Sequence, residues 1–309
     1  MKARAALPIF TTKVAEAMFN DLAKKMKGAA VNAALKFLSK KDRLAQMFFS
    51  TMASNIESIV ILPASHSVWK QIHNRLKKPE KHGLIESGKL GGVQVTCIRT
   101  GVGTPSVANV MQVLKETKPR AIIRVDYAGS LVEEMPVGSV FVAKDAIPGD
   151  GTSLHYINEE QARFKEILQG DGEPVENPDI DPVYSWLARA GITGKVACDA
   201  SLFELASNGA KTRKIELFSG SIWTTDGLFT ESKDKVALWK SRGSMSVDME
   251  TSLIYLLGAA WNIPAIAIHG ISDNLVNQKP FFELDHYDSG IETGIEKSID
   301  IIEAFLPKL

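Results

Sequence analysis

A glycine-rich segment and an arginine occupy the ends of two consecutive predicted strands. The alternating run 93–98 and the apolar run 121–125 each predict a strand, with a helical apolar pattern between them. Thr100 and Gly101 open the segment after the first strand, and Arg124 lies near the end of the second. Because ligands bind at the carboxyl edge of open α/β sheets, we expect these residues to share a site. Loop amides beside a guanidinium favour an oxyanion or a sugar as ligand.

Two acidic residues follow further predicted boundaries. Glu250 lies in the segment SVDMETS (246–252), which we expect to open an apolar helix that ends at Trp261. Asp273 follows the buried strand predicted over 264–269. Each acid has a structural explanation, since Glu250 would stabilise a helix N-terminus and Asp273 would form an Asx turn or cap. A role in ligand binding is the other explanation, and both stay open at this point.

The rest of the chain predicts an α/β domain preceded by helices. Apolar residues from Val14 to Phe37 form one helical stripe, and a second short helix is predicted over 43–52. We assign residues 1–55 to an N-terminal helical extension that packs on the domain or on a partner subunit, and 56–309 to the main domain. A basic amphipathic membrane helix is the alternative for the extension.

Further elements follow from periodicity and from turn residues. The patterns predict strands at 58–62, 139–144, 195–198 and 221–225, and helices at 68–76, 183–190 and 291–306. They predict a loop or hairpin at 77–91, a turn-rich polar segment at 150–156, a solvated loop at 169–182 and a lid at 280–288.

Composition limits the classes of partner and compartment. Lys and Arg number 36, as do Asp and Glu, so no net field attracts nucleic acid or an anionic membrane. No apolar run is long enough to span a bilayer, and no secretory signal is evident at the N-terminus. The two cysteines, Cys97 and Cys198, lie in predicted strands without a disulfide pattern, which favours a reducing, cytoplasmic location.

Four motifs carry a resemblance to a known family. In chain order they are RTGVGTPSVANV (99–110), IIRVDYAGSL (122–131), SVDMETS (246–252) and IHGISDN (268–274). The region 56–309 resembles the purine nucleoside and uridine phosphorylase family, which includes methylthioadenosine nucleosidases, and DGTSLHY (150–156) is most similar to the uridine phosphorylase branch. The resemblance implies a three-layer α/β phosphorylase-type fold, with a central mixed, partly closed sheet flanked by helices.

The resemblance also implies a reaction and its site residues. It implies cleavage of the N-glycosidic bond of a purine or uridine ribonucleoside by phosphate, which yields the free base and ribose 1-phosphate. Arg124, with Thr100, would bind phosphate, and Thr100 and Gly101 would form the loop near the nucleophile and the ribose. Met249 and Glu250 would bind the ribose hydroxyls. Asp273 would protonate or hydrogen-bond the base at N7. The implied substrate-binding set also contains Leu228, Phe229, Val247, Asp248 and His66.

The resemblance further implies that phosphate is a co-substrate, that no cofactor or metal is needed, and that a homodimer or larger homo-oligomer completes the pocket.

Two segments depart from the family pattern. The loop after the first strand reads Pro-Gly-Asp-Pro in the family, followed by an arginine, but is Pro63-Ala64-Ser65-His66 here. Small residues follow the family's arginine, whereas Asp126 and Tyr127 follow Arg124. Asp126 either points away from the pocket or faces it and repels phosphate.

These departures leave two alternatives beside a phosphorylase. One is a nucleosidase that uses water, with His66 or Asp126 as the general base, and the other is a non-catalytic nucleoside-binding or storage protein.

The preferred nucleobase, purine or uracil, also stays open. The uridine branch reads its pyrimidine with a Gln and an Arg, but Ser232 and Asp234 occupy those positions, so they oppose the assignment that DGTSLHY favours.

Overall fold

The computed structural model describes residues 37–159, 161–168, 179–189, 192–277 and 290–309. The predicted helix over 14–37 and the predicted lid over 280–288 therefore lie essentially outside the described residues, as does most of the predicted loop at 169–182. No described helix is both long and apolar enough to cross a bilayer.

One mixed sheet of ten strands forms the centre of the described structure. Its strands run in the order β10-β6-β8-β9-β5-β1-β4-β3-β2, with β7 beside β6. An additional pairing between β10 and β5 closes five of them into a barrel, and β1 to β4 extend the sheet from β5. The strands are β1 (Ile59–Leu62), β2 (Lys77–His82), β3 (Ile85–Leu90), β4 (Val93–Ile98), β5 (Ala121–Ser130), β6 (Val140–Gly149), β7 (Val196–Ala197), β8 (Leu217–Thr225), β9 (Ser244–Asp248) and β10 (Ala265–Asn274).

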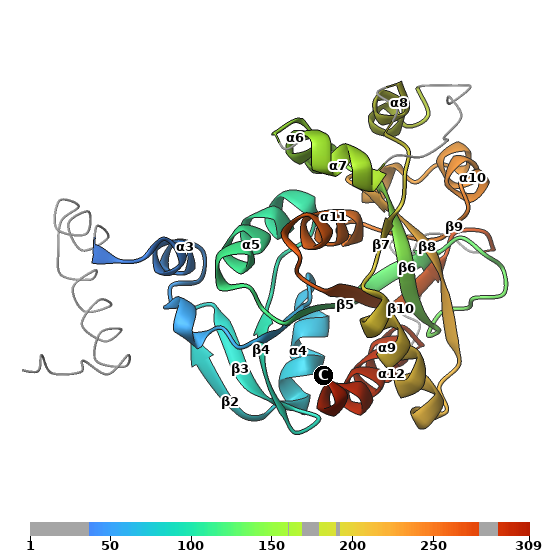
Figure 1. Ribbon diagram of the computed structural model, residues 1–309. Coiled ribbons are helices and arrows are strands. Elements are labelled where there is room, and N and C mark those ends of the chain that lie inside the picture. The colour runs from blue at the N-terminus through green and yellow to red at the C-terminus, as the bar shows by residue number, and fades with distance from the viewer. Residues whose placement is uncertain (1–36, 160, 169–178, 190–191, 278–289) are drawn as a thin grey trace, which may run out of the picture.

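Helices cover both faces of the sheet (Figure 1), which confirms the predicted three-layer fold with a partly closed mixed sheet. Helices α5 and α11 lie on one face, and α4, α9 and α12 lie on the other. The α-helices are α3 (Lys40–Phe49), α4 (His66–Arg75), α5 (Thr104–Thr117), α6 (Gly151–Glu159), α7 (Gln161–Leu168), α8 (Pro182–Arg189), α9 (Ala200–Arg213), α10 (Lys233–Ser241), α11 (Thr251–Trp261) and α12 (Gly290–Phe305). Short 3₁₀ turns are η1 (Ala53–Asn55), η2 (Leu228–Thr230) and η4 (Leu306–Lys308).

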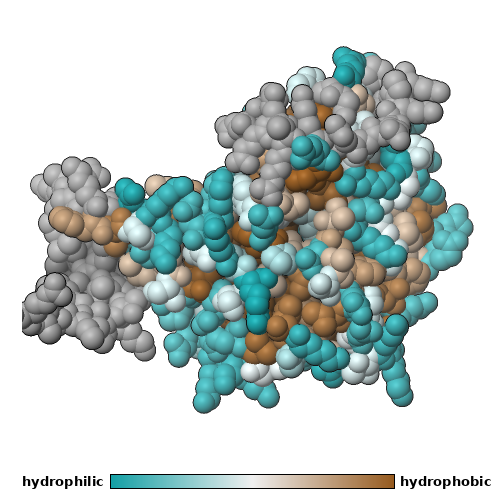
Figure 2. Space-filling view, in the orientation of Figure 1, coloured by the Kyte–Doolittle hydropathy of each residue, from teal (hydrophilic) through white to brown (hydrophobic). Residues whose placement is uncertain are grey.

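The buried strand β5 separates two hydrophobic cores. Ile122 packs into the core beneath α5 and α11, whereas Ile123 and Val125 pack into the core beneath α4, α9 and α12. This alternation follows from the two-residue period of a strand. Ile295 and Ile299 of α12 join the second core. Figure 2 shows apolar side chains gathered at the centre of the visible face over α9 and α12, with hydrophilic side chains around them.

Three boundaries around the predicted site differ from expectation. The strand predicted over 264–269 continues to Asn274 as β10, so Asp273 lies within the strand rather than after it. The helix expected to open at Ser246 begins at Thr251, because Ser246 and Val247 pair with β5 as part of strand β9. The strand predicted from the apolar run 121–125 continues to Ser130 as β5. Long-range strand pairing therefore overrides the local preference at all three boundaries.

Two segments without a predicted regular structure are helical. Residues 200–213 form α9, whose N-terminus is capped by Asp199 through a 2.9 Å hydrogen bond from the Leu202 amide. The polar segment 150–156 opens α6, and the Asp150 carboxylate accepts a 2.8 Å hydrogen bond from the Ser153 amide. Residues expected to form turns thus act as helix caps.

Candidate active site

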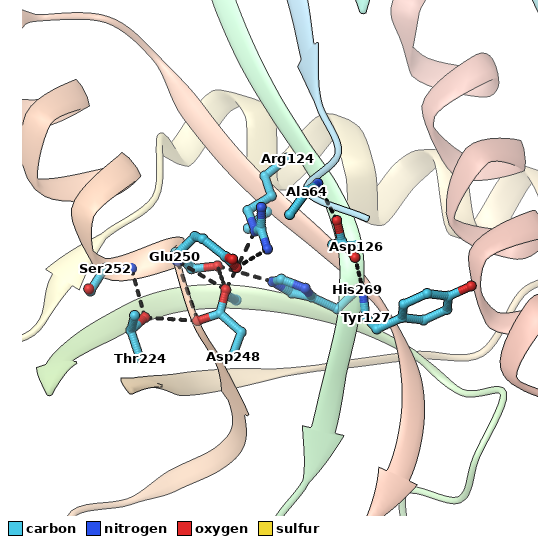
Figure 3. A network of polar contacts seen from close by, with 12 residues as sticks. Ala64, Arg124, Asp126, Tyr127, Thr224, Asp248, Glu250, Ser252 and His269 are labelled. Atoms are coloured by element: carbon cyan, nitrogen blue, oxygen red, sulfur yellow. Dashed lines mark hydrogen bonds and ion pairs between the residues drawn. The ribbon is translucent and has the colours of Figure 1, made fainter. Parts of the chain in front are cut away.

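The glycine segment after β4 is joined directly to the start of α11. The Gly103 amide donates a 2.6 Å hydrogen bond to Glu250 Oε1, across 147 positions of sequence. Gly101 and Gly103 have φ angles of 76° and 94°, which L side chains rarely adopt. The glycines therefore let the loop aim its amide at Glu250. The other carboxylate oxygen, Oε2, accepts a hydrogen bond from Arg124 Nη2 (Figure 3).

Arg124 is almost fully buried, at 1% exposed, and lies among carboxylates. Its Nε is 3.5 Å from Asp248 Oδ2, and its Nη2 contacts Glu250. Burial opposes the charge of the guanidinium, but the carboxylates of Glu250, Asp126 and Asp248 outweigh that cost and raise the pKa of Arg124. Nη1 is buried and makes no hydrogen bond within the described part of the chain, so it is available to a ligand oxygen.

Asp248 serves mainly to position its neighbours. Its carboxylate accepts hydrogen bonds from Thr224 Oγ1 at 2.8 Å and from the Thr251 amide at 3.0 Å. Thr251 Oγ1 also donates to Oδ2 at 2.5 Å. Asp248 therefore caps the first turn of α11, and it is this turn that holds Glu250 beside Arg124.

Asp126 is directed at the loop that follows β1. Its Oδ2 accepts hydrogen bonds from the Ala64 amide and, at 3.0 Å, from the Ser65 amide (Figure 3). Its Oδ1 accepts a 2.9 Å bond from the Tyr127 amide. Residues two apart share one face of a strand, so Asp126 lies on the same side of β5 as Arg124. Of the two placements considered from sequence, the one that faces the pocket is therefore found, and the carboxylate is 5% exposed.

The site also contains His269, which sequence reasoning did not select. Its Nε2 lies 3.2 Å from Thr251 Oγ1, and its backbone is in register with Asp126 between β10 and β5. Burial lowers the pKa of His269 to about 4, with the nearby Arg124 charge acting in the same direction. The imidazole is therefore neutral at physiological pH and supplies polarity without charge.

A cavity of about 170 Å³ lies over these groups. Seven of the residues selected from the sequence line it: Arg124, Leu228, Val247, Asp248, Met249, Glu250 and Asp273. The lining also includes Ala64, Ser65, Val102, Asp126 and Glu231. Five of the lining residues are acids and one is an arginine, so the cavity favours a ligand that is neutral or develops positive charge.

Four selected residues do not line this cavity. Thr100 Oγ1 donates to the carbonyl of Gly101 at 2.8 Å, so both residues serve the geometry of the loop. Phe229 is 78% exposed, next to the lining residue Leu228. His66 is exposed and stacks on Trp69 with their ring centroids 5.3 Å apart. The roles of these four residues in substrate binding stay predictions.

Glu231 was not selected from the sequence, because this residue directly follows the short turn η2, which no periodic pattern marks. Burial raises the pKa of Glu231 to about 8, and the charge of Asp273 adds to this effect. The pKa of Glu250 is shifted in the same direction, since burial raises it to about 7 although the Arg124 charge opposes this shift. A concentration of acids with raised pKa values in one cavity is typical of a functional site.

Other features of the described residues do not compete with this cavity. A larger cavity of about 430 Å³, lined by residues that include Cys198 and Tyr255, contains none of the residues selected from sequence. Within the described ranges, no group of three or more His, Cys, Asp or Glu side chains is arranged to hold a metal ion. Cys97 and Cys198 are free thiols.

Comparison with known proteins agrees with the resemblance seen in the motifs. The chain is 25% identical over 191 residues to a DeoD-type purine nucleoside phosphorylase of Clostridium novyi. The matched region is 62% of this chain and 68% of that relative. It is 26% identical over 219 residues to a guanosine phosphorylase of Halorubrum lacusprofundi, and the matched region is 70% of this chain and 77% of that relative. It is 22% identical over 232 residues to a 5'-methylthioadenosine/S-adenosylhomocysteine nucleosidase of Desulfotalea psychrophila, and the matched region is 74% of this chain and 86% of that relative.

Solved structures share the fold. A uridine phosphorylase from Vibrio fischeri superposes with a TM-score of 0.63 at 18% identity, covering 83% of this chain and 94% of that one. An S-adenosylhomocysteine nucleosidase from Streptococcus pyogenes superposes with a TM-score of 0.61 at 21% identity, covering 82% and 98%. The family model of the Phosphorylase superfamily matches residues 58–307. The chain therefore belongs to the Phosphorylase superfamily, whose members named above are nucleoside phosphorylases and nucleosidases.

Proposed function

We propose that this protein cleaves the N-glycosidic bond of a purine ribonucleoside, and that water is the nucleophile. The observation that carries the cleavage is the Glu250 carboxylate, held by the Gly103 amide at 2.6 Å and by Arg124 in the floor of the cavity. A carboxylate fixed in this way keeps lone pairs that accept hydrogen bonds from the 2′ and 3′ hydroxyls of ribose. Such charge-assisted bonds typically contribute about 1.5–3 kcal/mol each.

The charge of the cavity suits the transition state of this cleavage. Departure of the base leaves an oxocarbenium-like ribosyl group with positive charge. Asp126 and Glu250 both line the cavity and lie beneath that charge in the proposed binding mode. Preorganised carboxylates stabilise developing positive charge strongly in a site that is shielded from bulk solvent.

Asp126 favours water over phosphate. The Ala64 and Ser65 amides are the donors that the loop after β1 offers to an anion, and the Asp126 carboxylate already accepts from both. A phosphate dianion would have to displace this carboxylate and would then meet the remaining acids of the cavity. A neutral water meets neither cost, and Asp126 can accept its proton as general base.

The proposed step balances as follows. The bond between C1′ and the base nitrogen breaks, and its electron pair passes to the purine, which takes a proton at N7 from the protonated carboxyl of Asp273, the proposed general acid. Water adds to C1′ and gives a proton to Asp126. Ribose and free base leave, and both acids re-equilibrate with solvent. No cofactor is needed for this reaction.

Phosphorolysis is the second candidate. It is favoured by the buried Arg124 Nη1, which makes no hydrogen bond to any described residue and could bind a phosphate oxygen. The relatives named as phosphorylases support it as well. Arg124 would then need to exchange part of its pairing with Glu250 and Asp248 for the phosphate.

A purine is favoured over uracil by two observations. The three curated relatives described above are named for purine nucleosides or their derivatives. Ser232, at a position where the uridine branch reads its base, caps α10 through a 3.3 Å bond from the Lys235 amide, and Asp234 is exposed. Neither residue lines the cavity.

The test is release of free base from adenosine, inosine and uridine in phosphate-free buffer and at saturating phosphate. Release from a purine nucleoside at a rate independent of phosphate, with ribose as the sugar product, supports the proposal. Release that requires phosphate and yields ribose 1-phosphate replaces it with phosphorolysis. Tight nucleoside binding without release under either condition indicates the non-catalytic binding protein that the altered loop also allows.

We also propose a homo-oligomer in the cytoplasm. Val102 lines the cavity yet is 59% exposed, and Leu84 and Met47 are further exposed apolar residues of the described chain. A second copy packed against Val102 would cover this apolar surface and help to close the cavity. Light scattering coupled to gel filtration measures the mass, and a monomer at micromolar concentration would contradict the proposal.

A further inference from the structure

Two acids outside the cavity contact the segments that the hydrogen bond between Gly103 and Glu250 joins. Asp226 directly follows β8, and Asp150 directly follows β6. Neither acid lines the cavity, and the proposed reaction uses neither of them. Asp226 contacts the segment of Gly103, whereas Asp150 contacts the segment of Glu250.

Asp226 anchors the start of α5. Thr104, which directly follows Gly103 and is fully buried, donates from Oγ1 to Asp226 Oδ1 at 3.0 Å. Its Oγ1 also lies 3.0 Å from Thr152 Oγ1. Because a carboxylate only accepts and a threonine has one hydroxyl proton, Thr104 donates to Asp226 and Thr152 donates to Thr104. Gly103 is the N-cap of α5 and has no side chain to cap that helix, so the Thr104 hydroxyl fixes the start of α5 through Asp226.

Asp150 anchors the segment of Glu250. Its carboxylate is fully buried, and its Oδ2 accepts 2.8 Å hydrogen bonds from Ser252 Oγ and Ser153 Oγ. Ser252 lies two residues after Glu250 in the first turn of α11, and its amide donates to Thr224 Oγ1 at 2.9 Å (Figure 3). The turn that follows Glu250 is therefore tied to the start of α6 as well as to β8.

The two acids are joined to each other through Gly151. The Gly151 amide, directly after Asp150, donates to Asp226 Oδ2 at 2.7 Å. Asp226 therefore gives one carboxylate oxygen to α5 and the other to α6, which lies beside both α5 and α11 (Figure 1). Contacts thus run from the start of α5 through both acids to the start of α11, and the 2.6 Å bond from the Gly103 amide to Glu250 closes them into a ring.

We propose that Asp226 and Asp150 form a clamp that holds the Gly103 amide against the Glu250 carboxylate, and that Asp226 is thereby a positioning residue for ribose binding. The assignment to ribose rests on the proposed function, whereas the clamp concerns a contact within the chain. Each oxygen of Asp226 accepts from a different segment, so replacing one oxygen by an amide nitrogen breaks one of the two contacts. Loss of either contact loosens the start of α5 relative to the start of α6, and the Gly103 amide moves with α5.

The protonation of Glu250 depends on the clamp. Burial raises the pKa of Glu250 to about 7, and the hydrogen bond from the Gly103 amide acts against this rise. The charged groups that act on Glu250 are Arg124, which lowers its pKa, and Asp248 and Asp126, which raise it. Opening the clamp leaves these three in place but weakens the Gly103 bond, so the pKa of Glu250 should move further upward. Removal of a nearby negative charge would move it downward, so the direction separates a clamp effect from a charge effect.

The first test is a carbon-13 NMR titration of the Glu250 carboxyl, whose resonance is assigned by its loss in Glu250→Gln. It compares the parent with Thr104→Val, which removes the hydroxyl at constant shape and charge, and with Asp226→Asn. Asp199→Asn is the matched control, because Asp199 caps α9 and does not line the cavity. We expect the pKa of Glu250 to rise by about one unit in both clamp variants, the effect of one charge-assisted hydrogen bond, and to stay unchanged in the control. An unchanged pKa of Glu250 in Thr104→Val would overturn the clamp.

Kinetics with adenosine test the role in ribose binding. KM should rise by about tenfold in Thr104→Val while kcat changes less, because the contact between Glu250 and ribose is present before and during the reaction. The rise of kcat/KM with pH should move to higher pH together with the pKa of Glu250. In the Glu250→Gln background, Thr104→Val should have almost no further effect, since the charged contact is already lost. Additive losses in the double variant would overturn the positioning role.

The NMR titration separates this inference from the proposed function. It requires no substrate, and thermal unfolding establishes that each variant is folded. A raised pKa of Glu250 in the clamp variants supports the clamp even if no nucleoside is cleaved, and an unchanged value overturns it even if cleavage is observed. An equal rise in Asp199→Asn would also overturn the clamp, because loss of any helix-capping acid would then have the same effect.

Discussion

The Ser65 amide lies 3.0 Å from Asp126 Oδ2, so a carboxylate of the chain itself occupies the donors of the loop after β1. This contact joins residues 61 positions apart and sets an anion where an exogenous one would otherwise bind. It also leaves Asp126 against the cavity rather than in solvent.

Replacing Asp126 by Gly should reverse the proposed preference for water over phosphate. The change removes the proposed general base, whose contribution is typically about 10²–10⁴-fold, and frees the Ala64 and Ser65 amides for phosphate. We expect phosphate-independent base release to fall by about 10²-fold or more and a dependence on phosphate to appear. Initial rates against phosphate concentration measure both effects. Asp126→Asn, which keeps the shape, should lose the hydrolytic rate without gaining as much phosphate dependence.

Replacing Glu250 by Gln should weaken nucleoside binding and change the pH profile. Because burial raises the pKa of Glu250 to about 7, the carboxylate proposed to bind ribose becomes fully charged only above neutrality. In the parent, kcat/KM should therefore rise with pH through about 7. The variant should have a lower kcat/KM at pH 8 and no such rise. The ribose assignment fails if the variant keeps the parent's activity.

Removing the Arg124 side chain should destabilise the fold. Arg124→Ala leaves Glu250 and Asp248 buried without their cation, and breaking a buried pair typically costs about 3–5 kcal/mol. Arg124→Lys should restore only part of the loss, because an ammonium lacks the planar fork. Urea unfolding at pH 7.5 measures the loss in free energy of unfolding for both Arg124 variants. The matched control is Arg75→Ala, whose partly exposed pair with Asp300 at 2.8 Å should contribute about 1 kcal/mol or less.

Gly103 should be required for activity beyond its cost in stability. Its φ of 94° strains any other residue, so Gly103→Ala should lose about 1–3 kcal/mol of stability and misplace the amide that holds Glu250. Gly92→Ala is the control, since Gly92 has a φ of 86° and open space around it. Thermal unfolding should be affected in both variants, whereas kcat/KM should fall only for Gly103→Ala. A similar loss of activity in both would mean that strain alone explains it.

The raised pKa values of Glu231 and Glu250 predict how stability depends on pH. Each group holds its proton in the folded state to a higher pH, about 8 and about 7, than in the unfolded chain. The folded state therefore binds more protons across this range, so the free energy of unfolding should decrease as pH rises from about 4.5 to 8. Unfolding midpoints in urea between pH 5 and 8.5 measure the slope. Glu231→Gln should show a shallower slope, and a slope equal to the parent's would contradict this.

Much of the site followed from the sequence because local signals mark it. Strand periodicity placed Arg124 near the functional edge, and the order of four motifs brought Glu250 and Asp273 into the same hypothesis. All three line one cavity. Glycine at positions 101 and 103 signalled unusual backbone angles, which the structure has at 76° and 94°.

Other features depend on partners far apart in the chain. Ser246 and Val247 carry a helix-opening pattern, yet pairing with Ser130 and Gly129 makes them a strand. Such a pairing involves residues more than a hundred positions away, and no local pattern records it. The same holds for Glu231, which reaches the cavity only because η2 follows the closed part of the sheet.

The sequence by itself determined the chemical groups, the α/β alternation and the order of the motifs, since these depend on residue type and short-range period. Only the tertiary structure decided what each charged group meets. It directed Asp126 at the Ser65 amide, paired Arg124 with two carboxylates and placed Glu231 in the same cavity as Asp273. These relationships arise from the register of β5 against β1, β9 and β10, and register is fixed by the packing of the whole sheet rather than by neighbours along the chain.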